Sequence, residues 1–258
     1  MDPFVKKPDP IAPEPEVEAR MADLSAYTVI GEETTDRRTD KLTFTSTGEA
    51  GSSAIYLRDG GTLYLKNPEI HGYGEMNEAD LRNELGSKYG FCAAVLSNQK
   101  TSHVTLVNPK IVCHEQSTAN GAYAIFGGAV VIEGGTIDTC NRQGHGVDAS
   151  YGGHIYCNGG RNSGALATDF QGGYITVRDI DATTEIPGSP GIYTAGKSII
   201  TAYNSKFLSK GCEAVMVAHS LGHTYLYDCE LTGTVALNTH NSMSPEYSYI
   251  HMFGGKLN

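Results

Sequence analysis

The chain repeats one short pattern of strands and turns, and this repeat restricts the fold more than any other feature. The segment SSAIYLRDGGTLYLKNPEIHGYG (52–74) reads as a short strand, a glycine turn, a β-branched strand, an Asn turn and a further short strand. Seven related segments follow, beginning with CAAVLSNQKTSHVTLVNPKIVCHE and ending with the degenerate VALNTHNSMSPEYSYIHMFGGKL. A period of roughly 20–45 residues is typical of solenoids, in which each unit stacks on the next.

Aligning the copies gives one predicted inward column, whose members are Ile55, Val95, Tyr123, Val147, Leu166, Ile192, Val215 and Leu237. The first interval is the longest because it contains EMNEADLRNELGSKYG. The charges and leucine spacing of this insertion predict a short helix near residues 75–89, outside the stack.

A coil of this length is too small to bury its own apolar side chains, so it must stack on its neighbours. Inward positions are then aliphatic, and corners need Gly, Asn or Asp. We therefore predict an all-β, single-stranded right-handed parallel β-helix over residues 25–258, preceded by a flexible tail at residues 1–24. An antiparallel β-sandwich is the alternative, but it predicts evenly spaced strands without a fixed inward column.

Composition excludes several classes of function. The net charge of −10 and the lack of a basic stripe argue against nucleic-acid binding. No run approaches the ~20 apolar residues of a membrane span. The first residues carry proline and charge where a secretion signal needs an apolar core, which predicts a cytoplasmic protein, or a secreted one if a signal has been removed.

The six cysteines are Cys92, Cys113, Cys140, Cys157, Cys212 and Cys229, without a CxxC pair. Free, mostly buried thiols are therefore expected. A bridge between Cys113 and Cys140, which occupy similar places in successive copies, is the main exception.

Several runs, among them LYLKNPEI, HGVDASYGGHI, ALATDFQGGYITV and LYDCELTG, resemble bacterial β-helix proteins of the adhesin-like or autotransporter-passenger-like type. These are similar in turn to the wider pectate-lyase-like superfamily. The resemblance covers about residues 42–257 and implies the β-helix fold. That fold hosts lyases, isomerases and adhesins alike, so the resemblance does not fix an activity.

Residues flanking an inward position point outward, and stacking brings them onto one sheet face. Asp148 and Asp169 are predicted to lie one coil apart on that face. Two neighbouring carboxylates repel, which raises the pKa of one and makes it a proton donor near neutral pH. The alternative is that each aspartate only stabilises its own turn.

Tyr193, beside Lys197, is a further acid–base candidate, although aromatic packing is the alternative. His145 and His154 flank one coil and His219 and His223 another, and histidine suits proton transfer. HSLGH has the spacing of a zinc helix but reads as a turn, so no metal is predicted. The predicted catalytic residues are Asp148, Asp169, Tyr193, His145 and His154, and the predicted substrate-binding residues are Tyr56, Arg58, Lys197, Met216, His219, Asn238 and His240.

Two functions stay open at this stage. One is a lyase, isomerase or cyclase that uses side-chain acid–base catalysis without a cofactor, on a small molecule or carbohydrate. The other is a non-catalytic adhesin-like or carbohydrate-binding solenoid. Because an open solenoid end exposes unpaired backbone, we also expect a cover over one end, such as the tail, the last loop or the second subunit of a homodimer.

Overall fold

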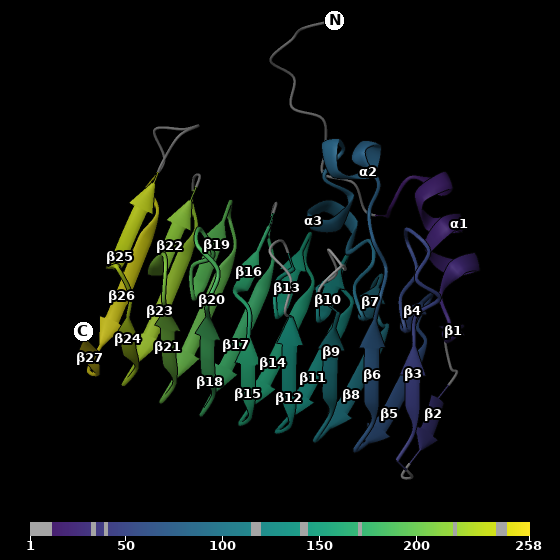
Figure 1. Ribbon diagram of the computed structural model, residues 1–258, viewed down its shortest axis with the longest axis horizontal. Coiled ribbons are helices and arrows are strands. Elements are labelled where there is room, and N and C mark those ends of the chain that lie inside the picture. Colours follow the sequence, from purple (N-terminus) through teal and green to yellow (C-terminus); the bar gives the residue numbers. More distant parts are fainter. Residues whose placement is uncertain are drawn as a thin grey trace, which may run out of the picture.

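The computed structural model shows a parallel β-solenoid of about eight turns, which confirms the predicted fold class. It describes residues 12–31, 35–38, 41–114, 120–139, 144–169, 172–218, 221–240 and 247–258. Three parallel sheets run the length of the stack, and each coil contributes one strand to each sheet (Figure 1). Within the described chain there are three short helices and none long and apolar enough to cross a membrane.

Sheet A begins each coil. Its strands are β1 (Thr28–Ile30), β4 (Ile55–Arg58), β7 (Val95–Asn98), β10 (Ala122–Ile125), β13 (Val147–Ser150), β16 (Leu166–Thr168), β19 (Ile192–Ala195), β22 (Glu213–Ala218) and β25 (Val235–His240).

Sheet B follows after a tight turn. Its strands are β2 (Thr35–Arg38), β5 (Thr62–Lys66), β8 (His103–Val107), β11 (Ala129–Glu133), β14 (His154–Asn158), β17 (Tyr174–Arg178), β20 (Ile199–Tyr203), β23 (His223–Tyr227) and β26 (Tyr249–Phe253).

Sheet C completes each coil. Its strands are β3 (Thr43–Thr45), β6 (Glu69–Gly72), β9 (Lys110–Cys113), β12 (Thr136–Thr139), β15 (Arg161–Ser163), β18 (Asp181–Thr184), β21 (Lys206–Ser209), β24 (Glu230–Thr232) and β27 (Lys256–Leu257).

The corner between sheets B and C shows why the repeat needs particular turn residues. Asn67, Asn108, Asp179, Asn204 and Asp228 occupy this corner in five coils, each with φ between 47° and 54°. Only Gly, Asn and Asp enter this left-handed region at low cost. The Asn and Asp turns predicted from the repeat are thus a backbone requirement of the coil.

The predicted inward column is correct at seven of its eight positions and wrong at Tyr123. Ala122 pairs with both Val95 and Val147, whereas Tyr123 pairs with Leu96 and Asp148. Tyr123 therefore lies one residue out of the inward column, on the outer side of sheet A. A shift of one residue reverses the face of a strand, and Tyr123 joins the candidate site described below.

The predicted insertion is helical and consists of α2 (Glu78–Arg82) and α3 (Leu85–Tyr89). Asn77 caps α2, accepting hydrogen bonds from the backbone of Ala79 and Asp80. Such a cap stabilises a helix end by about 1 kcal/mol. The helices lie outside the stack, beside the N-terminal coils (Figure 1).

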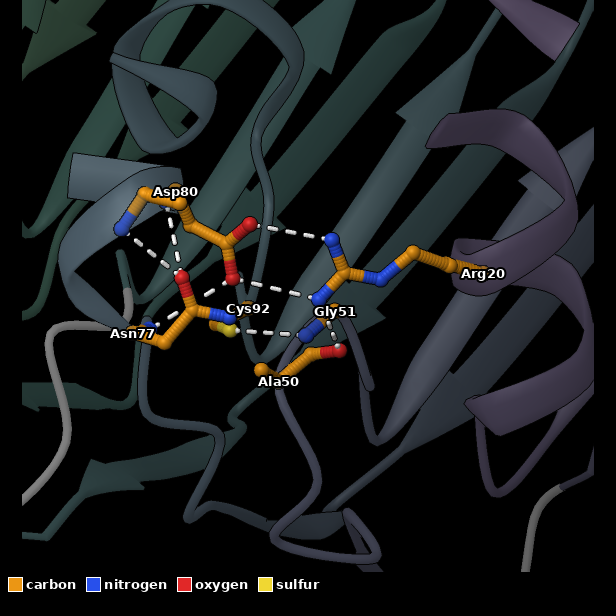
Figure 2. Close-up of polar contacts among 7 residues, drawn as sticks. Arg20, Ala50, Gly51, Asn77, Asp80 and Cys92 are labelled. Carbon is orange, nitrogen blue, oxygen red and sulfur yellow. Dashed lines mark hydrogen bonds and ion pairs between the residues drawn. The ribbon is translucent and has the colours of Figure 1, made fainter. Parts of the chain in front are cut away.

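A further helix, α1 (Pro15–Leu24), occupies part of the segment for which a flexible tail was predicted. Met21 is fully buried against the solenoid core. Arg20 donates to both carboxylate oxygens of Asp80, at 2.9 and 3.1 Å, and to the carbonyl of Ala50 (Figure 2). The bidentate pair fastens α1 to α2.

The five cysteines within the described residues are free thiols, four of them buried, as expected. Burial raises the pKa of the Cys157 thiol, which lies inside the solenoid, to about 12. The bridge considered between Cys113 and Cys140 involves a residue outside the described parts of the chain.

Candidate functional site

The outer face of sheet A carries the predicted site in register. Asp148 of β13 pairs with Ala167 of β16, which pairs with Tyr193 of β19. Met216 and Asn238 follow in the next two strands. Tyr56 lies in the same column near the N-terminal end, next to Leu96.

The N-terminal half of this face is covered, although substrate-binding residues such as Tyr56 were expected on it. Tyr56, Tyr123 and Asp148 are all fully buried. The Tyr123 hydroxyl lies against the Ser87 carbonyl of α3 and 2.8 Å from Ser150 Oγ. The insertion therefore packs on the outer face of sheet A over β10 and β13.

Two predicted substrate-binding residues lie under or beside this cover and have structural partners. The Tyr56 hydroxyl accepts a hydrogen bond from Asn98 Nδ2 at 2.8 Å. Arg58 forms an ion pair with Glu18 of α1, with 3.2 Å between Nη1 and Oε1.

At the edge of the cover, His145, Asp148 and Asp169 come together. We call these three residues the carboxylate–histidine cluster. One ligand atom from each, a histidine nitrogen or a carboxylate oxygen, lies within 4.8 Å of the other two. His145 Nε2 is 3.9 Å from Asp169 Oδ2. Both aspartates and His145 were predicted from the sequence, and the structure brings them together.

The three side chains differ in their access to solvent. Asp148 is fully buried, whereas the side chains of Asp169 and His145 are 15% and 25% exposed. Neither carboxylate oxygen of Asp148 accepts a hydrogen bond of good geometry from a described residue, and the nearest donors are the backbone N–H groups of Ala149 and Asp169. The carboxyl group of Asp169 is its close neighbour, so one proton shared between the two acids would satisfy both.

The electrostatics of the cluster follow from burial. Burial raises the pKa of Asp148 well above its usual range, and the charge of Asp169 raises it further. The pKa of Asp169 is also raised by burial, although His145 and the Ser87 side chain oppose the rise. Burial lowers the pKa of His145, and Asp169 opposes this effect. No Lys or Arg neutralises the two acids in the part of the chain described.

Tyr193 lies on the open side of the cluster and is partly exposed. Its pKa is raised to about 12, first by burial and then by the charges of Asp169 and Asp148. The hydroxyl is therefore a proton donor at neutral pH and not a base. Lys197 is exposed in the following turn, at φ 49°.

Other predicted site residues lie elsewhere. His154 shares a coil with His145, but its side chain lies on the outer face of sheet B, stacked 4.7 Å from Tyr174. Asn238 donates to Glu213 Oε1 at 2.9 Å, two coils beyond Tyr193. His219 and the side chain of His240 fall outside the described residues.

Two open concave surfaces lie on sheet C, which we did not predict as a site. A groove of about 580 Å³ runs across the outer faces of β12, β15, β18 and β21. A second hollow of about 390 Å³ adjoins it at the ends of the same strands and shares Asp138, Ser163 and Thr183 with it. Of the predicted catalytic and substrate-binding residues whose side chains the structure describes, none lines either hollow.

A row of charged side chains lines the groove. Arg161 pairs in register with Asp181, which pairs with Lys206. Beyond the groove in both directions, residues of the same row form ion pairs: Glu69 with Lys110 at 2.6 Å, and Glu230 with Lys256 at 3.6 Å. Inside it, Arg161, Asp181 and Lys206 form no ion pair with any described residue, and all three are exposed.

No protein-family model matches the chain, and no curated protein or solved structure is significantly similar to it. The likeness to β-helix proteins therefore stands on the solenoid fold alone.

Proposed function

We propose that the protein is a carbohydrate-binding β-solenoid whose ligand lies in the groove on sheet C. The observation that carries this proposal is the row of Arg161, Asp181 and Lys206, which are charged and exposed in a concave surface and lie beyond ion-pair distance of every described residue. Charged and hydroxyl groups that are not already paired are free to hydrogen-bond a polyhydroxylated ligand.

The second outward row of the groove supports the same ligand class. Asp138, Ser163 and Thr183 follow one another in register on β12, β15 and β18. Ser163 donates to Asp138 Oδ1 at 2.7 Å, which orients both groups at the floor. The groove crosses four strands, about 14 Å at ~4.8 Å per coil, so an extended oligosaccharide suits it better than a single sugar.

The test is a glycan array probed with the labelled chain, followed by calorimetry on the oligosaccharides that bind. We expect Asp181→Asn and Arg161→Gln each to weaken binding about tenfold or more, since each replaces a charged hydrogen-bonding group of the floor by a neutral amide, which hydrogen-bonds hydroxyl groups less strongly. Lys110→Gln is the matched control, because Lys110 occupies the same row but is already paired with Glu69 outside the groove. The absence of any bound glycan, or equal binding by all variants, would overturn the proposal.

An enzyme of lyase, isomerase or cyclase type is the second candidate. It is supported by the exposed edge of the carboxylate–histidine cluster, where Asp169, His145 and Tyr193 face solvent beside one another. Groups of this kind are suited to acid–base catalysis. Asp148, which has no exposed atoms, would act only through Asp169.

This candidate is tested by incubating the chain with the oligosaccharides that bind and analysing the products by mass spectrometry. We expect Asp169→Asn to abolish product formation and Tyr193→Phe to reduce it, with substrate binding retained. Unchanged turnover in both variants would remove the cluster from the mechanism.

A homodimer through the C-terminal end of the solenoid is also proposed. It is supported by β26, which reads Tyr249-Ile250-His251-Met252-Phe253 and pairs ring with ring and aliphatic with aliphatic when placed antiparallel to its own copy. Sedimentation should detect the dimer, and His251→Lys should dissociate it, whereas Tyr156→Lys on the middle of the same sheet should not. A monomeric parent chain would contradict this proposal.

We also propose a reducing compartment such as the cytoplasm as the location of the protein. The free thiols of the described residues support it, and fractionation of cells would test it.

A further inference from the structure

We propose that the carboxylate–histidine cluster is a binding site for a divalent transition-metal ion of the zinc type, held by His145, Asp148 and Asp169. This inference goes beyond the proposed carbohydrate binding and does not depend on it. It rests on the position of the three side chains and on the state of Asp148.

The geometry is that of a partial coordination shell. One nitrogen and two carboxylate oxygens lie within 4.8 Å of one another. In zinc sites, ligand atoms stand about 2.0–2.2 Å from the ion, so two donors of one ion lie at most about 4.4 Å apart. The three side chains reach that spacing by a small rotation about their side-chain torsions. The residues come from two adjacent coils, His145 and Asp148 from one and Asp169 from the next, so the stacked backbones hold them in place.

Asp148 supplies an independent reason to expect a ligand. Its side chain is fully buried and directed into the cluster, yet neither oxygen accepts a hydrogen bond of good geometry from a described residue, the backbone N–H groups of Ala149 and Asp169 being the nearest donors. An ionised carboxylate in such a position is costly unless a proton or a cation compensates it. A divalent ion compensates both aspartates at once.

The donor set selects the class of ion. Imidazole favours zinc and similar transition metals, whereas Ca²⁺ takes six to eight oxygens and Mg²⁺ an octahedron of oxygens. Three protein donors with an exposed side leave room for water or another ligand, as in open zinc sites. The Ser87 side chain, hydrogen-bonded to Asp169, would serve as the outer support that orients a ligand.

A bound ion and an acid–base proton exclude each other at these carboxylates. The metal site therefore competes with the enzymatic candidate above and leaves the sheet C groove untouched. A failure of metal binding would leave the carbohydrate proposal standing, and a failure of carbohydrate binding would leave the metal site standing.

The experiment is calorimetric titration of the metal-free chain with Zn²⁺ alone, repeated with Mn²⁺, Ca²⁺ and Mg²⁺. We expect one equivalent of Zn²⁺ per chain, weaker binding of Mn²⁺, and no Ca²⁺ or Mg²⁺ binding in the same range. His145→Gln and Asp148→Asn should each lower the Zn²⁺ affinity by about tenfold or more, since loss of even an outer support costs 10–100-fold in known sites.

His71→Gln is the matched control, because His71 and His114 form a second histidine pair, 3.1 Å apart, away from the cluster. It should leave the Zn²⁺ affinity unchanged. Zn²⁺ binding that survives Asp148→Asn and disappears in His71→Gln would assign the ion to the sheet C histidines and overturn the proposal, as would no binding at all.

Folding of each variant is checked by its thermal midpoint in EDTA. Zn²⁺ should raise the midpoint of the parent chain, because a ligand that binds the native state stabilises it. It should not raise the midpoint of Asp148→Asn.

Discussion

The outer faces of sheets A and C use similar residues one coil apart and arrive at opposite environments. On sheet A, Asp148 and Asp169 lie together without a cation from the described residues, the first fully buried and the second only 15% exposed. On sheet C, Asp181 lies between Arg161 and Lys206, exposed in an open groove. The difference comes from the insertion, which covers sheet A next to the aspartates, whereas none of the described helices covers the groove on sheet C. The stacking of the coils therefore sets the distance between the charged side chains. The insertion determines how far they are buried, and with that the free-energy cost of their charge.

Replacing the buried acid should have the largest effect on stability. In EDTA at pH 8, Asp148→Asn should raise the free energy of unfolding by roughly 1–3 kcal/mol, because it removes a carboxyl group that is fully buried beside a second acid. Urea denaturation gives the value. Asp181→Asn is the exposed counterpart and should change it by less than about 0.5 kcal/mol. Equal effects would mean that burial does not distinguish the two faces.

The same comparison predicts a dependence on pH. The pKa of Asp148 is raised in the folded chain, so its contribution to stability is complete below its unfolded pKa of about 3.9 and is lost as the pH rises through the folded value. The difference in unfolding free energy between Asp148→Asn and the parent should therefore grow from pH 5 to pH 9. A constant difference across this range would contradict the raised pKa.

Loosening the cover should have a smaller effect. Tyr123→Phe removes the hydroxyl that lies between Ser87 of α3 and Ser150 of β13. We expect a loss of about 1 kcal/mol, the usual contribution of one hydrogen bond, together with faster hydrogen exchange in residues 78–90. Tyr156→Phe, an exposed tyrosine of sheet B, is the control and should change neither quantity.

The smallest effect on stability is expected for the exposed ion pair between Lys110 and Glu69, which lies in the charged row of sheet C beyond the groove. Lys110→Ala breaks the contact with Glu69, but exposed pairs contribute little because water and salt screen them. The unfolding midpoint should stay within error at both low and high salt. A clear loss at low salt would show that the whole row acts as one network.

Much of this architecture could be predicted from the repeat, because the constraints on it are local. Aliphatic residues must point inward, and turns such as Asn204 need a left-handed backbone. Once the register was known, Asp148 and Asp169 could be placed on one face. Tyr123 was misplaced because its neighbour Ala122 is as apolar as a core position requires, so hydrophobicity alone could not separate the two.

The cover and the groove could not be predicted in the same way. Whether an outward residue is exposed depends on contacts across the chain, such as that between Ser87 and Tyr123. The charges of Arg161, Asp181 and Lys206 follow Gly, Asn or Asp turns in successive copies, and that recurrence was the signal available for the groove. This recurrence indicates that the three charged residues lie in one row on the sheet. Whether they form ion pairs depends on side-chain geometry, which the sequence does not give.

The ion pair between Arg20 and Asp80 makes the two ends of the solenoid differ in stability. Each coil touches only its neighbours, so a solenoid comes apart from its weaker end and not all at once. The Arg20–Asp80 ion pair and the buried Met21 hold α1 against the first coils. In the last coil, by contrast, Val235, Phe253 and Leu257 are each about half exposed. In the monomer, fraying should therefore begin at the C-terminal coil and advance toward the insertion.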